Sequence, residues 1–188
     1  CRERSKCGAL FGYRSRVPTT LGAIQILFNV TRVADVLAAN NLPEWTLPNT
    51  FMVDENRVIR IPFECACSTG SYGEPTNPPV YTVQKGDDIS CIITTMFSGL
   101  VGSTDIEQGN NLSNLDILWE GQELQIPLPC SCGEVNGVNV VHYGLKLEYR
   151  VTLEQLSDEY HVDPHTMLAV NQASNPDDLL GIMDIPLP

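Results

Sequence analysis

The sequence lacks any uninterrupted apolar run near the roughly 20 residues that cross a bilayer, and no apolar signal segment opens it. It is also poor in basic residues: 11 Lys and Arg stand against 23 Asp and Glu, for a formal net charge of -12. Such a negative field repels nucleic-acid phosphates and anionic membranes. We therefore expect a mature, soluble chain with no nucleic-acid partner, attached to a membrane only through an anchor outside these residues.

Catalytic motifs are missing as well. There is no H-E-x-x-H, no G-x-S-x-G and no phosphate-binding loop. The adjacent pairs Asp87/Asp88 and Asp177/Asp178 have the residue type of glycosidase carboxylates. A glycosidase, however, holds its two carboxylates on separate elements that flank the scissile bond. We therefore predict a binding protein rather than an enzyme, with no cofactor.

Cysteine is abundant, and four of the seven cysteines form two C-x-C units. Structural zinc sites usually use spacers of two to four residues, and the three histidines follow no zinc pattern. We therefore favour disulfides and expect no metal. Setting Cys91 aside, six cysteines would form three bridges, and spacing alone leaves 15 possible connectivities open. The cysteines are Cys1, Cys7, Cys65, Cys67, Cys91, Cys130 and Cys132.

Two N-x-S/T sequons, at Asn29 and Asn111, agree with a secreted, oxidising setting, and we predict glycosylation at both. Cys91 lies in a predicted amphipathic helix over residues 89–97, about opposite the apolar stripe. This unpaired thiol is therefore expected to face solvent or another module.

One pattern occurs three times along the chain. An asparagine follows an apolar residue by four positions, as at the end of a short amphipathic helix, and an Ile-Pro motif lies downstream of it. A β-prone run and an earlier amphipathic helix precede each asparagine, so each copy reads strand, helix, helix, strand. The asparagines are Asn40, Asn110 and Asn171, and the motifs begin at Ile61, Ile126 and Ile185.

The pattern divides the chain into an N-terminal cysteine segment and three modules of about 50 residues, in the α+β class. Residues 68–79 are a Gly/Pro/Ser-rich linker, and residues 133–137 a short turn region. Units this small bury little surface and commonly need cross-links, which the cysteines at the junctions would supply. The segment is 1–7, and the modules are 8–64, 79–130 and 138–188.

Three such modules, two C-x-C spacers and the string Tyr81-Thr-Val-Gln-Lys-Gly-Asp resemble the LysM ectodomains of plant receptor-like proteins, of the chitin elicitor-binding type. The resemblance implies three tandem β-α-α-β LysM modules in a disulfide-linked cloverleaf. It also implies the bridges Cys1–Cys67, Cys7–Cys132 and Cys65–Cys130. The sequence departs from the family pattern at Cys91, where a small residue without a thiol is more usual.

The resemblance further implies a groove in the middle module, between the loop after its first strand and the loop before its last strand. Backbone hydrogen bonds and compact apolar pockets suit a neutral N-acetylglucosamine polymer. For Asp87 or Asp88, capping the following helix is as well supported a role as contact with the sugar. Trp119 is expected to pack in the protein rather than to contact the sugar. The ligand-binding residues are Gln84, Lys85, Gly86, Asp87, Asp88, Ile89, Asn114, Leu115, Asp116, Ile117 and Leu118.

The implied function is an extracellular pattern-recognition ectodomain that binds chitin oligosaccharides at the plant cell surface, in immune or symbiotic signalling. A LysM receptor kinase would be its co-receptor, and ligand could induce a dimer. Two alternatives remain open: a peptidoglycan-binding receptor, and a co-receptor that acts mainly through protein contacts. The negative charge disfavours an anionic ligand such as peptidoglycan.

Overall fold

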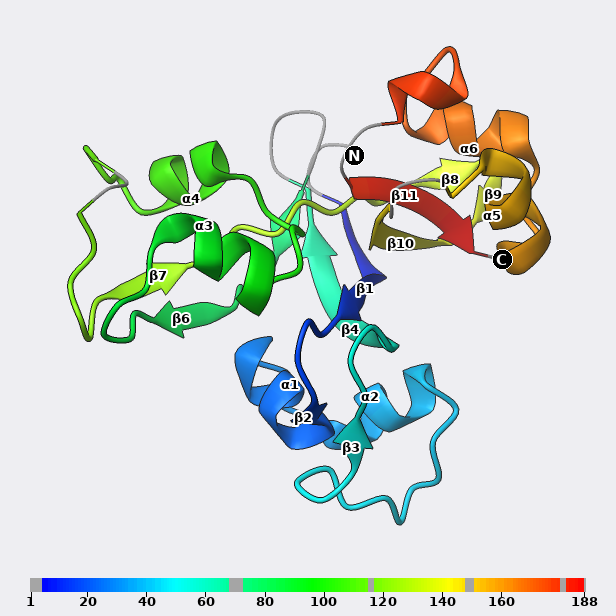
Figure 1. Ribbon diagram of the computed structural model, residues 1–188. Coiled ribbons are helices and arrows are strands. Elements are labelled where there is room, and N and C mark those ends of the chain that lie inside the picture. The colour runs from blue at the N-terminus through cyan, green and yellow to red at the C-terminus, as the bar shows by residue number, and fades with distance from the viewer. Residues whose placement is uncertain (1–4, 68–72, 115–116, 148–150, 180–181, 188) are drawn as a thin grey trace.

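The computed structural model describes residues 5–67, 73–114, 117–147, 151–179 and 182–187. Three lobes surround a central pair of strands, β1 and β4 (Figure 1). In each lobe a pair of helices lies between strands, as predicted, and the first lobe has a second short strand on each side. We call the lobes the first, second and third units in chain order. No helix in the described ranges is long and apolar enough to cross a bilayer.

The elements of the three units have the following bounds. The first unit contains β1 (Lys6–Arg14), β2 (Thr19–Thr20), α1 (Leu21–Leu27), α2 (Val33–Ala39), β3 (Met52–Val53) and β4 (Val58–Ala66). The second contains β6 (Val80–Thr82), α3 (Ile89–Cys91), the π-helix η1 (Ile92–Met96), α4 (Ser103–Gly109) and β7 (Glu123–Gln125). The third contains β10 (Val141–Lys146), α5 (Leu153–Tyr160), α6 (Pro164–Val170), the 3-10 turn η2 (Pro176–Asp178) and β11 (Ile182–Leu187). Between units lie β5 (Glu74–Pro75), β8 (Glu134–Val135) and β9 (Val138–Asn139).

A continuous sheet joins the first and third units. Its strand order is β11-β10-β1-β4-β5, and β1 pairs with β10 in parallel, from Ala9 opposite His142 to Gly12 opposite Leu145. The second unit instead has its own two-stranded sheet, β6-β7. The repeat pattern did not predict the parallel pairing, because residues that meet across it are more than 130 positions apart in the chain. The cloverleaf is therefore held by shared backbone hydrogen bonds as well as by disulfides.

The asparagine that follows the second helix has the same role in every unit. In the second unit the Asn110 side-chain amide donates to the Ile106 carbonyl (2.8 Å) and the Gln125 carbonyl (2.8 Å), and its oxygen accepts from the Gln125 N–H (2.7 Å). Asn40 and Asn171 make the equivalent bonds in the other two units. Each asparagine thus ties the end of a helix to the last strand of its unit.

The predicted helix over residues 89–97 forms, but with a change of winding in its middle. A short α-helical start, α3, passes into the π-helix η1, whose wider turn is closed by a bond from the Phe97 N–H to the Ile92 carbonyl (3.1 Å). Ile92 and Phe97 of the apolar stripe are fully buried. Cys91 lies on the exposed side as a free thiol, so the expectation that it faces solvent is confirmed.

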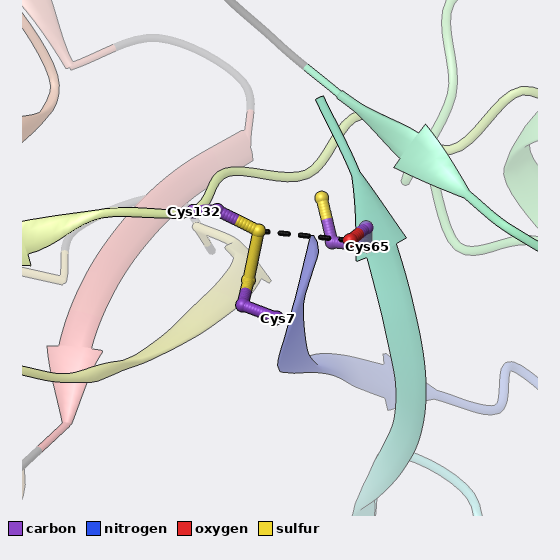
Figure 2. Close-up of side chains that lie close together, drawn as sticks. All are labelled: Cys7, Cys65 and Cys132. Carbon is purple, nitrogen blue, oxygen red and sulfur yellow. Dashed lines mark hydrogen bonds between the residues drawn. A yellow bond between two sulfur atoms is a disulfide. The ribbon is translucent and has the colours of Figure 1, made fainter. Parts of the chain in front are cut away.

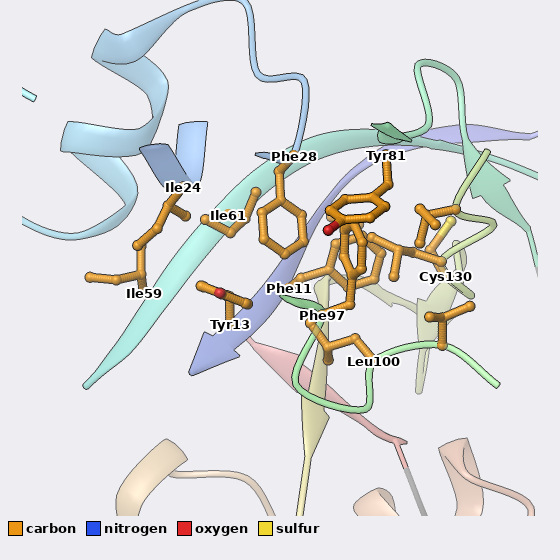
Figure 3. Packing of buried hydrophobic residues seen from close by; sticks show 14 of the residues in the cluster. Phe11, Tyr13, Ile24, Phe28, Ile59, Ile61, Tyr81, Phe97, Leu100 and Cys130 are labelled. Carbon is orange, nitrogen blue, oxygen red and sulfur yellow. The ribbon is translucent and has the colours of Figure 1, made fainter. Parts of the chain in front are cut away.

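The first and second units share one hydrophobic core. Phe28 of the first unit contacts the Phe97 ring of the second edge to face (5.7 Å between centroids), and Tyr13 and Tyr81 extend this aromatic chain (Figure 3). The third unit has a separate core around Tyr143 and the apolar faces of its helices. Burial of aromatic side chains is a large source of stability, so the first two units are expected to depend on each other.

Two disulfides converge where the three units meet. Cys7 of β1 is bonded to Cys132 (Figure 2), and Cys65 of β4 is bonded to Cys130. These are two of the pairings that the resemblance implied. Cys67 is also disulfide-bonded, while its expected partner Cys1 lies outside the described residues. The sulfurs of Cys7, Cys65 and Cys132 lie within 4.8 Å of one another. Because sulfurs joined in disulfides are not thiolates, this cluster is a cross-link rather than a metal site.

Candidate functional site

The first wall of the candidate groove is the loop between β6 and α3. Gly86 has a φ of +90°, a conformation that side chains with a Cβ rarely adopt, and the space around it is open. Gln84 and Lys85 are exposed beside it. The loop therefore presents bare backbone and flexible polar side chains toward solvent.

Two aspartates fix the shape of this loop. Asp87 accepts hydrogen bonds from the Tyr81 hydroxyl (2.7 Å) and from the Gln84 N–H (2.8 Å). Asp88 accepts from the Cys91 N–H (2.7 Å) and is the N-cap of α3. Burial, and then the hydrogen bond and charge of Asp87, raise the pKa of Tyr81, so this tyrosine stays a protonated donor at physiological pH. Both carboxylates therefore have structural roles: Asp88 caps the helix, and Asp87 holds the loop. Helix capping was the alternative to sugar contact in the sequence analysis.

The second wall is the loop between α4 and β7. Ile117 and Trp119 are exposed, at 52% and 69%, whereas Leu118 between them is half-buried and packs on the core. This alternation is that of extended backbone. Asn114 is exposed, and the predicted residues Leu115 and Asp116 lie outside the described residues.

Trp119 corrects the expectation that it would pack. Its ring is in solvent, while its backbone N–H donates to the Gln122 side-chain oxygen (3.0 Å). The turn at Gly121 (φ +83°) then brings the two walls together at their base, where the Val83 carbonyl accepts from the Gly121 N–H and the Val83 N–H donates to the Gln122 carbonyl (both 2.8 Å). The exposed Trp119 is therefore a candidate ligand contact. The sequence did not indicate this, because a Trp next to a strand is more often part of the core.

In the first unit the loop before the last strand is hydrogen-bonded directly to the start of the first helix. There the first two helical N–H groups, of Leu21 and Gly22, donate to the carbonyls of Phe51 (3.0 Å) and Pro48 (2.9 Å) in the opposite loop, and β2 pairs with β3. The matching groups of the second unit, by position after the N-cap, are the N–H groups of Ile89 and Ser90. Among the described residues neither has a hydrogen-bond acceptor. These are the donors that a helix start leaves available to a ligand.

The predicted glycosylation sites are accessible. Asn29 and Asn111 are both exposed, and both have a φ near +50° at the turn after a helix. Asn111 lies three residues before Asn114, so a glycan there would stand at the rim of the groove. Glycosylation at both sites remains a prediction.

A family model described as LysM domain matches residues 81–127, which cover the second unit and both walls of the groove. The chain contains a LysM domain at these residues. It is 36% identical over 185 residues to LysM domain-containing GPI-anchored protein 2 of Arabidopsis thaliana, covering 97% of this chain and 52% of that one. It is 34% identical over 184 residues to the chitin elicitor-binding protein of Oryza sativa subsp. japonica, covering 97% and 51%. The LysM chain thus spans about half the length of these curated relatives.

Solved structures show the same fold. The crystal structure of the ectodomain of a receptor like kinase superposes with a TM-score of 0.80 at 18% identity, covering 99% of the LysM chain and 94% of that chain. The LYK3 ectodomain gives 0.76 at 20% identity, covering 98% and 92%. The chain therefore shares the fold of these ectodomains, and its disulfides agree with an extracellular location.

Proposed function

We propose that this LysM chain binds N-acetylglucosamine polymers, chitin oligosaccharides foremost, in the groove of its second unit. The observation that carries the proposal is the contrast between the two grooves. The first unit uses its helix-start N–H groups internally, whereas the second leaves those of Ile89 and Ser90 without an acceptor among the described residues. Acetamide carbonyls and hydroxyls of the polymer are neutral acceptors of the right kind.

The second wall supplies the apolar part of the site. Ile117 gives a compact aliphatic surface for acetyl methyl groups, and Trp119 gives a flat face on which a sugar ring can rest. Asp87 and Asp88 contribute by holding the first wall in shape rather than as principal ligand contacts. Sugar contact for Gln84, Lys85, Gly86 and the rest of the predicted set, apart from these two aspartates, is part of this proposal. We propose binding without catalysis.

The wider role follows the relatives. One of them is named a chitin elicitor-binding protein, and another, from Physcomitrium patens, chitin elicitor receptor kinase 1. We infer a cell-surface receptor ectodomain, held by an anchor outside these residues as in the GPI-anchored relatives, that signals through a LysM receptor kinase. A long oligomer that engages two ectodomains would form a ligand-induced dimer, because the second contact is made at high effective concentration.

The test compares matched substitutions in the two units by calorimetry. Ile117→Lys and Trp119→Ala in the second unit should each weaken binding of a chitin octamer about tenfold or more, which corresponds to about 1.4 kcal/mol. Leu47→Lys and Trp45→Ala change residues that are at least as exposed (68% and 81%), in the corresponding loop of the first unit, and should leave affinity unchanged.

Wild-type affinity should also rise with oligomer length. Equal loss from both pairs of substitutions would place the site elsewhere. Clear heat with muropeptides and none with chitin would instead select the peptidoglycan alternative. Absence of heat with either sugar, in a folded protein, would favour the role in protein contacts.

A further inference from the structure

One histidine is buried at the point where the third unit meets residues 130–140. This segment joins the second and third units and contains Cys130 and Cys132, and we call it the disulfide-bearing linker. His142 on β10 is 5% exposed, and the other buried polar side chains of the described residues are two serines, Ser15 and Ser98. The remaining histidines, His161 and His165, are exposed. His142 is therefore the buried group among these that can change charge near neutral pH.

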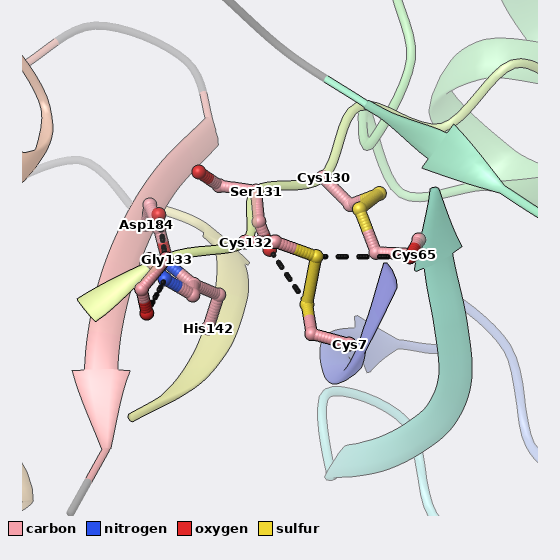
Figure 4. Close-up of a disulfide and its surroundings, with 8 residues drawn as sticks. All are labelled: Cys7, Cys65, Cys130, Ser131, Cys132, Gly133, His142 and Asp184. Carbon is pink, nitrogen blue, oxygen red and sulfur yellow. Dashed lines mark hydrogen bonds and ion pairs between the residues drawn. A yellow bond between two sulfur atoms is a disulfide. The ribbon is translucent and has the colours of Figure 1, made fainter. Parts of the chain in front are cut away.

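Both ring nitrogens of His142 face acceptors (Figure 4). Nδ1 lies 2.6 Å from the Asp184 carboxylate on β11, and Nε2 lies 3.3 Å from the Gly133 carbonyl. A carboxylate and a carbonyl can only accept, and a neutral imidazole carries a single N–H. Only the imidazolium, with two N–H groups, satisfies both partners at once.

The two bonds join different parts of the molecule. Asp184 belongs to the third unit, where both its backbone N–H and its backbone carbonyl are hydrogen-bonded to the side chain of Asn171. Gly133 directly follows Cys132, whose disulfide anchors the linker to β1. The ring of His142 therefore contacts the disulfide-bearing linker at Gly133 through one nitrogen, and the last strand of the third unit, β11, through the other.

The surroundings supply negative charge, while the positive charge of the amino terminus acts against it. A cavity of about 350 Å³ beside the pair is lined by Asp105 of α4 as well as by Asp184, and no described Lys or Arg lines it. On the neighbouring strand β1 the residue opposite His142 is Ala9, and Glu134 next to Gly133 is exposed. The second oxygen of Asp184 is buried without a hydrogen bond. A neutral ring would leave this carboxylate without its counter-charge.

The titration of His142 agrees in direction. Burial alone lowers the pKa of His142, but the hydrogen bond and charge of Asp184, together with the Gly133 carbonyl, outweigh it and raise the pKa above its ordinary value. A raised folded-state pKa contributes stability that is fully present below about pH 6.5, the unfolded value, and that is lost as the pH rises through the folded value.

We propose that His142 is a proton-dependent latch, whose imidazolium holds the third unit to the disulfide-bearing linker in acidic surroundings and whose deprotonation loosens this joint. The inference concerns the joint between units and does not depend on what the groove of the second unit binds. It predicts that acidic and alkaline conditions favour a tight and a loose third unit, respectively.

The test follows thermal unfolding from pH 5 to pH 9 in the wild type and in His142→Gln, with His161→Gln and His165→Gln as exposed controls. The wild type and both controls should lose several degrees of melting temperature as the pH rises through the His142 titration. His142→Gln should be less stable at pH 5 and should lack this step. The same step in His142→Gln as in the wild type would overturn the proposal.

A second measurement on the wild type alone guards against failure of the variant to fold. NMR titration of the His142 ring should give a pKa above the ordinary histidine value of about 6.5. Amide hydrogen exchange in residues 133–140, corrected for the intrinsic effect of pH, should rise several-fold between pH 6 and pH 9, while residues 80–83 stay unchanged. A His142 pKa at or below about 6.5, or unchanged hydrogen-exchange protection of residues 133–140, would refute the latch.

Discussion

The repeated asparagine provides a test of whether the three units unfold as one body. Replacing Asn110 with Ala removes three hydrogen bonds, two to the Gln125 backbone and one to the Ile106 carbonyl. At about 1 kcal/mol for each bond, reduced because water can reach part of this site, we expect a loss of about 2 kcal/mol in the free energy of unfolding. Asn40→Ala and Asn171→Ala remove the same set of bonds and should cost about the same.

Calorimetric melting is the assay, with the disulfides intact. If the shared core, the shared sheet and the disulfides make one cooperative body, each variant should show a single transition lowered by roughly 4 to 8 °C. Asn139→Ala, an exposed asparagine whose side chain makes no hydrogen bond with described residues, is the control and should shift the transition by little. A separate early transition in only one variant would refute the single body, and shifts no larger than the control would refute the assigned role of these bonds.

Two further predictions concern the cysteines. Replacing both Cys65 and Cys130 with Ala should lower the free energy of unfolding by about 4 kcal/mol, which is the chain-entropy value for a cross-link that spans 65 residues. Urea titration would measure this loss, and a loss below about 1 kcal/mol would contradict the prediction. Cys91 should react with one equivalent of a maleimide in the native, unreduced protein, because it is exposed and the other described cysteines are paired; a second reactive thiol by mass spectrometry would contradict the pairing.

Local features were predictable from the sequence because their causes are local. The periodic apolar residues of each copy mark the helices, and the recurring asparagine marks where a helix meets the last strand. The predicted strands lie within or beside the observed ones, since short β-prone runs bounded by turn residues are a strong signal. The regular helix over residues 89–97 was the exception, because the periodicity of a stripe does not distinguish an α-helix from one with a π-helical turn.

Relations between units could not be read in the same way. Parallel pairing of β1 with β10 depends on edges that become neighbours only after the units assemble, and no local signal encodes it. The exposure of Trp119 and the half-burial of Leu118 depend on how the loop is braced at Gly121. His142 carried no motif, since Asp184 is brought to it by another strand, β11, and Gly133 by the linker between the second and third units. The groove residues came from the resemblance, and their contact with sugar stays a prediction.

The parallel pairing of β1 with β10 also has a consequence for the order in which the chain can fold. During synthesis β4 can pair with one edge of β1 early. The other edge of β1 stays uncovered until residues 141–146 emerge, more than 120 positions after the end of β1. An uncovered strand edge is a template for pairing with a second chain. Truncating the third unit would leave that edge permanently open, so a shortened protein is expected to self-associate through β1, and the C-terminal unit serves the rest of the molecule as a closing strand pair.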